Sequence, residues 1–290
     1  MMERLAYIFP GQGSQYVGMG KTLCEKYSEA KKVFEEANDL LGYNISEICF
    51  NGPFDELSKT RNTQPAILIS SIAAFRVFNK EFGLEPNFLV GHSFGELTAL
   101  TCAEAISFED AIKISRLKGK IVEEEIKEQK TTMLAVKGLS IDSVEKACSE
   151  VSRSIGLAVV AIINSPNQIV VSGSIGAIDF LENKFIESGA VVEKLAVSVA
   201  FHSPFLKEAT NRTYNELLKY NFDKPKWPVL SSLTVSLYTD HYDIKRNLSN
   251  YLSEKISWPK TIEYLENENI RIGLEIGPKS VIKKIMEDYN

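Results

Sequence analysis

The sequence predicts an α/β fold in which a small domain is inserted into a larger one. Short apolar runs alternate with longer amphipathic stretches along the chain, a pattern typical of strands followed by helices. The rhythm changes at about residue 131, where strands become closely spaced. With 290 residues, 44% of them hydrophobic, the chain is long enough to bury the cores of one or two domains.

The part before this change contains the elements of an α/β domain. They are a buried strand at 5–10, a helix at 20–42 that ends at a glycine cap, a helix at 63–82, a strand, tight turn and helix at 87–105, and a helix at 108–129. The same kind of pattern returns near the end of the chain, with a helix after residue 203, a strand at 227–235, a helix at 261–270 and a strand at 271–278.

Residues 130–199 predict a separate small domain. Their apolar runs and amphipathic segments follow the order β-α-β-β-α-β, which is the ferredoxin-like arrangement. We therefore expect a discontinuous large domain formed by residues 1–129 and 200–290, with the small domain between the two segments. The cleft between the domains is the expected place for a ligand.

Composition excludes several classes of protein. The formal net charge is −5, which offers no basic footprint for nucleic acid. No apolar run is long enough for a membrane span or a signal-peptide core, so we expect a cytoplasmic protein that does not bind membranes. The four cysteines form no CxxC pair and lie near no histidine at metal-ligand spacing, so we expect reduced thiols and no metal site.

The sharpest motif is Gly91-His92-Ser93-Phe94-Gly95, which fits the G-x-S-x-G pattern of a nucleophile elbow. An apolar run precedes the motif and a helical pattern follows it, which is the context that such an elbow requires. The helix N-terminus behind Ser93 would offer backbone N–H groups to a developing oxyanion.

A serine nucleophile needs a base, and the chain has only three histidines. His92 adjoins Ser93 and should point away from it in a tight turn. His241 lies in a polar run that has the character of a solvated loop. His202 lies where the chain leaves the predicted small domain, between an apolar run and a Ser-Pro pair, so it is the expected base.

A glycine-flanked polar turn, Gly11-Gln12-Gly13-Ser14-Gln15, follows the first strand directly. Ligand contacts in α/β sheets gather at such carboxyl ends of strands. Gln12 is therefore a candidate for shaping the oxyanion site. The turn is not a phosphate-binding P-loop, because G-x-x-x-x-G-K-[ST] is absent.

Five ordered motifs together resemble the malonyl-CoA:acyl-carrier-protein transacylase family, which includes the acyltransferases of polyketide synthases. The motifs span nearly the whole chain and read FPGQGSQ, GHSFGE, INSPNQIVVSG, AFHS and LEIGP. The resemblance implies an α/β-hydrolase-like body with a ferredoxin-like insert. It also implies a ping-pong reaction in which an acyl group passes from CoA to the serine, and from there to the phosphopantetheine thiol of an acyl carrier protein, with no permanently bound cofactor.

The resemblance also implies roles for individual residues. Ser93 would be the nucleophile and His202 the general base, while the backbone N–H groups of Gln12 and Phe94 would form the oxyanion hole. The histidine would be oriented by the backbone carbonyl just before Trp258, which belongs to Ser257. On the substrate side, Asn164 would line the cleft and His92 is a further candidate.

One position departs from the family pattern. Malonyl-specific members carry an arginine in a segment like M-R-G-K, where it grips the malonate carboxylate. Alignment on Gly119 and Lys120 places Lys118 at that position, and Arg116 lies on a different helix face. A lysine keeps the positive charge but not the bidentate fork.

The sequence therefore leaves the acyl group and the pathway open. The main hypothesis is transfer of a malonyl-type group, in fatty-acid or polyketide synthesis. The alternatives are a hydrolase that clears acyl groups from carrier proteins, in which water resolves the acyl-enzyme, and a catalytically silent docking module, against which the intact Ser93 and His202 argue.

Overall fold

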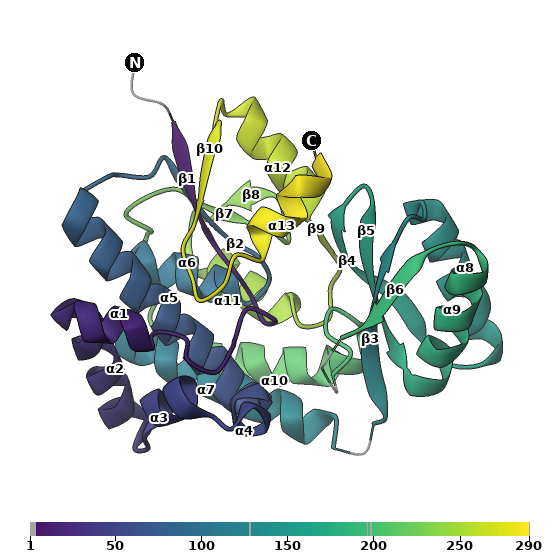
Figure 1. Cartoon of the computed structure of the whole chain (residues 1–290), viewed down its shortest axis with the longest axis horizontal. Coiled ribbons are helices and arrows are strands. Elements are labelled where there is room, and N and C mark those ends of the chain that lie inside the picture. Colours follow the sequence, from purple (N-terminus) through teal and green to yellow (C-terminus); the bar gives the residue numbers. More distant parts are fainter. Residues whose placement is uncertain (1–3, 128, 196, 198, 290) are drawn as a thin grey trace.

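The computed structural model describes residues 4–127, 129–195, 197 and 199–289, and it contains two mixed α/β regions that lie side by side (Figure 1). The larger region is built around a sheet with the strand order β10-β1-β2-β7-β8. The smaller is built around a sheet with the order β6-β3-β5-β4-β9. The predicted α/β class with a large and a small sheet is thus confirmed.

The large sheet is parallel from β10 to β7 and antiparallel only between β7 and β8. Its strands are β1 (Leu5–Phe9), β2 (Phe88–Gly91), β7 (Val229–Ser231), β8 (Ser236–Leu237) and β10 (Ile272–Glu275). Because β1 and β2 are parallel neighbours with Phe9 opposite Gly91, the turns that follow them meet at one edge of the sheet.

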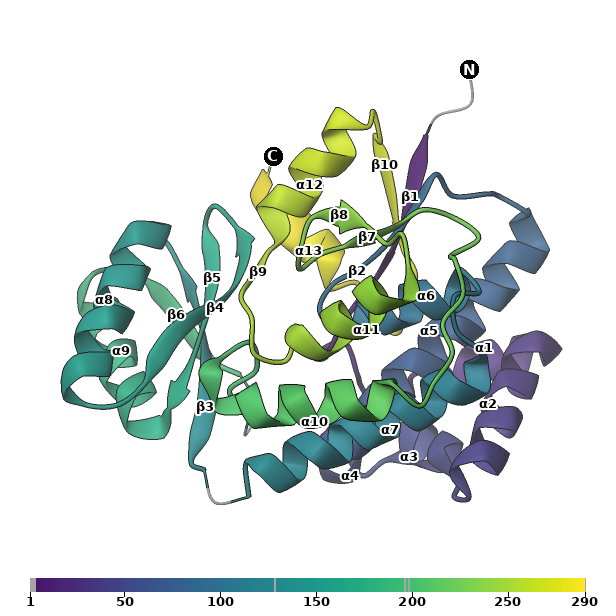
Figure 2. The same ribbon diagram turned by 180° about the vertical axis from the view of Figure 1, so that it is seen from behind.

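Helices cover both faces of this sheet. They are α1 (Lys21–Lys26), α2 (Ser28–Leu41), α3 (Ile45–Asn51), α4 (Phe54–Ser58), α5 (Thr60–Phe82), α6 (Gly95–Cys102), α7 (Phe108–Glu125), α10 (Lys207–Leu217), α11 (His241–Asn250), α12 (Trp258–Asn267) and α13 (Ile282–Met286), with short 3-10 turns at Pro204–Leu206 and Glu287–Tyr289. Figure 2 shows α7 and α10 lying along each other on the way to the small region.

The small region has the predicted ferredoxin-like order. Its elements are β3 (Thr131–Lys137), α8 (Ile141–Ser154), β4 (Ala158–Ser165), β5 (Gln168–Ser174), α9 (Ile175–Glu187) and β6 (Val191–Lys194). The first four strands of the sheet are antiparallel. A short fifth strand, β9 (Ile256–Ser257), joins β4 in parallel from the C-terminal part of the chain.

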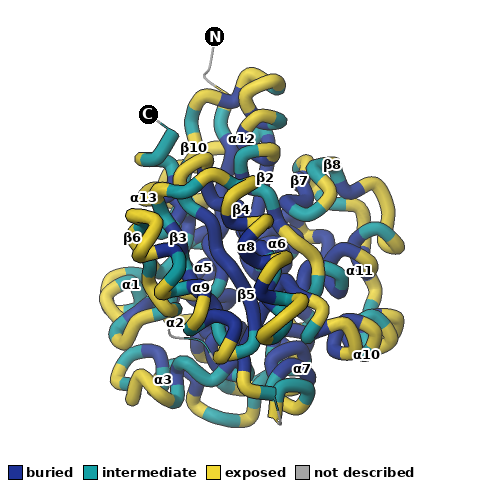
Figure 3. The backbone as a smooth tube through the Cα atoms, turned by 90° about the vertical axis from the view of Figure 1, so that its right-hand side faces the viewer, coloured by how far each residue is buried: buried dark blue, intermediate teal, exposed yellow. Residues whose placement is uncertain are grey.

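The main core continues across the boundary between the two regions. It joins residues of the large region to Met133, Ile162 and Val170 of the small sheet. A second cluster fills the space between the small sheet and α8 and α9, and a third lies under α12 and α13. Figure 3 shows that the central strands are mostly buried, whereas exposed residues lie at the periphery, on the outer faces of helices and on loops. Domain limits at residues 129/130 and 199/200 stay a prediction.

Several elements differ from the sequence-based expectation. The predicted helix at 20–42 is two helices, because Tyr27 takes an extended conformation with φ −130° and ψ 118° between α1 and α2. The second of them ends at Gly42 as predicted, with φ 70°. His241 begins α11, where Asp240 caps the helix, and does not lie in a loop. The predicted helix at 108–129 includes residue 128, and the last strand predicted in the small domain includes residue 196; both residues lie outside the described part of the chain.

Candidate active site

Ser93 lies on a sharp turn between β2 and α6, as the motif predicts. Its φ is +52°, in the left-handed region that non-glycine residues rarely adopt. The flanking glycines make this turn possible. A Cβ atom at Gly91 would lie 2.0 Å from the nitrogen of Glu96, and one at Gly95 would lie 2.1 Å from the carbonyl oxygen of Phe9. The turn therefore packs so tightly that no side chain fits at either position.

His202 meets Ser93 across 109 positions of the chain. The Ser93 Oγ lies 2.8 Å from the Nε2 of His202, within hydrogen-bond distance. His202 is only 3% exposed, and burial lowers the pKa of its imidazole to about 3. It is therefore neutral near pH 7, which is the state that can accept a proton from a hydroxyl.

The other ring nitrogen of His202 is held by the main chain. The Nδ1 lies 3.1 Å from the carbonyl oxygen of Glu254. The backbone N–H of His202 donates separately to the carbonyl oxygen of Leu252 at 2.8 Å. A carbonyl can only accept a hydrogen bond, so the Nδ1 carries the proton and Nε2 is the free base.

The prediction that Ser257 supplies this carbonyl is wrong; Glu254 does so. Ser257 already belongs to β9, opposite Ile163, and its carbonyl oxygen faces the first turn of α12, where the Thr261 hydroxyl donates to it at 3.5 Å. The segment before β9 is the part of the chain that passes His202. The position of Ser257 next to Trp258 in the sequence does not indicate which carbonyl of this segment faces His202.

The backbone N–H groups of Gln12 and Phe94 follow the neighbouring strands β1 and β2. A Cβ atom on Gly11 would lie 3.5 Å from the Phe94 nitrogen, which shows how closely the two turns approach. Ser14 fixes the first turn, because its hydroxyl and its N–H both donate to the Gly11 carbonyl. Among the described residues, neither the Gln12 N–H nor the Phe94 N–H has a hydrogen-bond acceptor. Both donors are thus available to an oxyanion.

His92 points away from Ser93, as expected, and fixes the wall of the site. Its Nε2 lies 3.0 Å from the Oδ1 of Asn164, and its ring packs edge-on against Trp258 with centroids 5.2 Å apart. Burial lowers the pKa of His92 to about 4. The carbonyl of Asn164 in turn accepts a hydrogen bond from the Tyr289 hydroxyl at 2.9 Å. The His92–Asn164 contact thus joins the elbow to β4 of the small sheet, and the Tyr289 contact joins the same strand to the C-terminal turn.

Ser93 and His202 open into a cavity of about 420 Å³ between the two regions. Its lining is mostly apolar and comes from both, as expected for a ligand cleft. The lining residues are Gln12, Gly13, Gln15, Tyr16, Phe54, Gln64, His92, Ser93, Phe94, Met133, Ile162, Glu193, Leu195, Val197, Phe201, His202, Tyr251 and Lys279.

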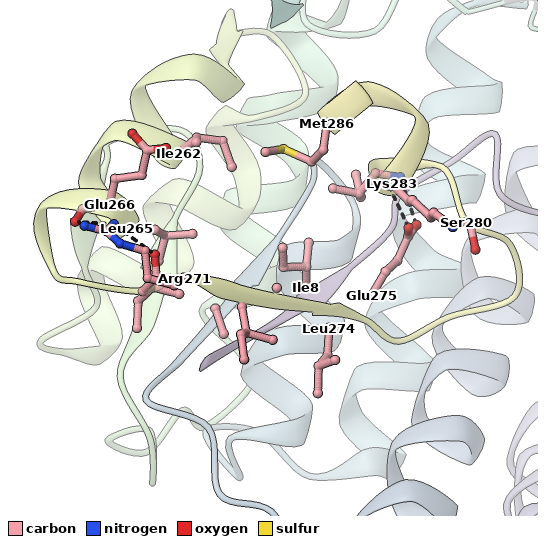
Figure 4. Close-up of a pocket in the computed structure, with 15 residues that line it drawn as sticks. Ile8, Ile262, Leu265, Glu266, Arg271, Leu274, Glu275, Ser280, Lys283 and Met286 are labelled. Carbon is pink, nitrogen blue, oxygen red and sulfur yellow. Dashed lines mark hydrogen bonds between the residues drawn. The ribbon is translucent and has the colours of Figure 1, made fainter. Parts of the chain in front are cut away.

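Another cavity, of about 510 Å³, lies between β10, α12 and α13 (Figure 4). Apolar side chains such as Ile8, Ile262 and Met286 line it. The Glu275 carboxylate is committed there, since it accepts the N–H groups of Val281, Ile282 and Lys283. This cavity contains neither Ser93 nor a histidine, so the chemistry belongs to the smaller cavity.

Lys118 does not line the catalytic cavity, contrary to the expected direct contact with substrate. Its side chain is 1% exposed, and its Nζ donates to the carbonyl of Leu248 at 2.6 Å and to the hydroxyl of Tyr251 at 2.5 Å. Burial lowers the pKa of Lys118 well below its usual value, while the Glu96 carboxylate opposes that shift. Tyr251 stands where Lys118 was expected, and no sequence motif marked it.

Within the described part of the chain, no group of three or more histidine, cysteine or acidic side chains is placed to hold a metal ion. Nor is any helix in those same residues both long and apolar enough to cross a membrane.

The fold and the site together define a class. A serine on a strand-turn-helix elbow, a buried neutral histidine and two free backbone N–H groups form the arrangement by which serine enzymes attack acyl groups. The comparisons with known proteins agree. Residues 6–289 match the model of the acyl transferase domain. The chain therefore belongs to the acyl transferase domain family, and it is an acyltransferase.

The similar proteins cover nearly the whole chain. A malonyl CoA-acyl carrier protein transacylase of Bacillus subtilis is 36% identical over 286 residues, which are 99% of this chain and 72% of that protein. The enzyme of the same name from Escherichia coli strain K12 is 35% identical, over 97% of this chain and 91% of that protein.

Solved structures show the same fold. An acyl carrier protein S-malonyltransferase from Vibrio cholerae has a TM-score of 0.92 at 34% identity, covering 99% of this chain and 94% of that one. A malonyl-transacylase in complex with a type II PKS acyl-carrier protein has a TM-score of 0.95 at 33% identity, covering 99% of this chain and 93% of that one. The expected body with a ferredoxin-like insert is confirmed by these likenesses.

Proposed function

We propose that this acyltransferase moves a malonyl-type group from CoA to the phosphopantetheine thiol of an acyl carrier protein, through an acyl-enzyme at Ser93. The observation that carries the proposal is the 2.8 Å contact between the Ser93 Oγ and the His202 Nε2 at the wall of a 420 Å³ cavity. The names of the similar proteins support malonyl as the acyl group, CoA as the donor and a carrier protein as the partner.

The first half-reaction acylates the enzyme. The Ser93 Oγ attacks the thioester carbonyl carbon and gives its proton to the His202 Nε2. The negative charge that develops on the carbonyl oxygen is bound by the N–H groups of Gln12 and Phe94. When the tetrahedral intermediate collapses, the carbon–sulfur bond breaks and His202 returns the proton to the CoA sulfur.

The second half-reaction runs the same steps with another thiol. His202 takes the proton of the pantetheine thiol, whose sulfur attacks the serine ester. The bond between the acyl carbon and the Ser93 Oγ then breaks, and His202 gives the proton back to that oxygen. The Glu254 carbonyl holds the Nδ1–H throughout, which stabilises the imidazolium formed in each step.

We propose that the enzyme holds no permanent cofactor and acts in the cytoplasm. The four cysteines support that location, because all are free thiols and three of them are buried. The similar proteins support transfer over hydrolysis, since each of those described above is a transferase or transacylase by name.

Intact mass spectrometry tests the proposal directly. The protein mixed with malonyl-CoA should gain the mass of one malonyl group, and Ser93→Ala should gain none. Addition of a phosphopantetheinylated carrier protein should move that mass onto the carrier. Loss of the adduct as free malonate before the carrier is added would support hydrolysis, and no adduct with any acyl-CoA would overturn acyl transfer at Ser93.

A further inference from the structure

Tyr251 separates Lys118 from the catalytic cavity. Tyr251 contributes to the lining of this cavity, whereas Lys118 does not. The Lys118 Nζ lies 3.8 Å from the centroid of the Tyr251 ring and within hydrogen-bond distance of its hydroxyl. An acyl group that occupies the cavity therefore meets the tyrosine first, and the lysine only through it.

Two hydrogen bonds hold the Lys118 amine. Its Nζ donates to the Leu248 carbonyl and to the Tyr251 hydroxyl oxygen, and an amine has donors for both bonds whether it is charged or neutral. The Tyr251 oxygen thus accepts, and its own O–H proton must point elsewhere. Among the described residues, that proton has no acceptor, and no carboxylate there forms an ion pair with Lys118.

Tyr251 also stands close to the reacting atoms. Its ring centroid lies 6.1 Å from that of His202, which contacts Ser93. A malonyl group on Ser93 ends in a carboxylate that is only two carbons beyond the ester carbon. A charged acceptor of this kind strengthens a hydrogen bond from a buried hydroxyl, the more so because water is excluded there.

We propose that Tyr251 is the specificity-determining residue of this site: its hydroxyl donates to the terminal carboxylate of a short acyl group, while Lys118 positions and polarises that hydroxyl from behind. The acyl groups selected are those that end in a carboxylate. This inference rests on the proposed function, because it names the residue that recognises the acyl group once that group is bound to Ser93.

Kinetics of acyl-enzyme formation with malonyl-CoA and acetyl-CoA test this assignment. For Tyr251→Phe, which keeps the ring, the ratio of kcat/KM for malonyl-CoA to that for acetyl-CoA should fall about 10- to 100-fold, the effect of one hydrogen bond to a charged group. Lys118→Met should lower the same ratio, chiefly through a higher KM for malonyl-CoA. The double variant should lose little more than Tyr251→Phe alone, because Lys118 acts through the tyrosine.

Tyr238→Phe is the matched control. Tyr238 is also buried and its hydroxyl donates to the Glu96 carboxylate, but it does not line the cavity, so removal of this hydroxyl should leave the ratio unchanged. An unchanged ratio in Tyr251→Phe would overturn the proposal. So would a loss in Lys118→Met that adds fully to that of Tyr251→Phe, which would show direct contact between Lys118 and the carboxylate.

The experiments distinguish failure of the proposed function from failure of the role assigned to Tyr251. If the wild-type protein forms no acyl-enzyme with either donor, the proposed function falls and the assignment of Tyr251 with it. If the wild type is acylated and Tyr251→Phe keeps its preference, only the assignment of Tyr251 falls. A thermal unfolding curve for each variant verifies that a changed ratio comes from a folded protein.

Discussion

Ser93 and His202 share an uncommon backbone conformation as well as a hydrogen bond. Their φ angles are +52° and +56°, both in the left-handed region, and their side chains meet at 2.8 Å. This region costs a non-glycine residue about 1–2 kcal/mol. Strain at both ends of one contact indicates that the surrounding structure holds each backbone so that Oγ and Nε2 face each other.

Glycine at position 93 should therefore stabilise the fold while abolishing activity. Ser93→Gly relieves the left-handed strain. Glycine also raises the conformational entropy of the unfolded chain, which offsets part of the gain in stability. We expect it to be about 0.5–1 kcal/mol more stable than Ser93→Ala, which keeps the strain and also lacks the hydroxyl. Urea unfolding of both variants measures this difference, and equal stability would show that the turn carries no strain.

The buried histidines should make stability depend on pH in a defined window. The pKa is about 4 for His92 and about 3 for His202, both below the usual 6.5 that applies in the unfolded chain. For each histidine, the unfolded state binds more protons than the folded state between pH 6.5 and the lower pKa of the folded state. The stability therefore rises with pH in this window and is lost as the pH falls below about 6.5. We expect a loss of about 1–2 kcal/mol for each histidine between pH 7 and pH 5.

Urea unfolding at these two pH values measures the loss. His202→Gln should show a smaller difference between pH 7 and pH 5 than the wild type, whereas His241→Gln, at an exposed position on α11, is the control. If His202→Gln keeps the full wild-type difference, His202 is not the source of this pH dependence.

The rate of acyl-enzyme formation should stay nearly constant down to about pH 5, because His202 remains neutral there.

Much of the fold could be predicted because its signals are local. The strand, glycine turn and helix around Ser93 lie together in residues 88–102, and the ferredoxin-like order follows from alternating apolar runs. The break at Tyr27 could not be predicted, since the helical pattern runs through it without a proline or glycine. Nor could β9, which has two residues and exists only by pairing with β4.

In the site, too, some residues could be predicted from local sequence and others could not. Ser93 and His202 could be identified from a motif and from the scarcity of histidines. Glu254 and Tyr251 could not, because their roles depend on the path of the chain after α11 and not on side-chain chemistry that a motif would reveal. Lys118 was recognised by alignment, but only packing shows that it lies behind Tyr251.

The elbow glycines should tolerate no side chain. At Gly95 a Cβ atom would lie 2.1 Å from the Phe9 oxygen, and neither backbone can move without separating β1 from α6. We expect Gly95→Ala to cost about 3 kcal/mol or more. Gly176→Ala in α9 is the control: nothing lies within 4 Å of its Cβ position, so it should gain up to about 1 kcal/mol in helix propensity. Thermal unfolding compares the two, and equal melting temperatures would refute the packing argument.

The Glu254 contact with His202 comes from the main chain, so its effect should follow backbone geometry and not side-chain identity. Glu254→Ala leaves the carbonyl in place, and its kcat should stay within about twofold of the wild type. Lys255→Pro removes no side chain that touches His202, but proline restricts the backbone of the preceding residue and so turns the Glu254 carbonyl. Its kcat should fall about 10- to 100-fold, because misplacement of a catalytic group by about 1 Å has an effect of that size.

Lys255→Ala is the matched control for the proline variant, since both lose the surface ion pair with Glu145 at 2.9 Å. That pair is half-exposed and contributes little, so Lys255→Ala should behave as the wild type. Stopped-flow measurement of acyl-enzyme formation compares the three variants. A large loss in Glu254→Ala would show that its carboxylate orients His202, and full activity in Lys255→Pro would show that the 3.1 Å contact with the Nδ1 is dispensable.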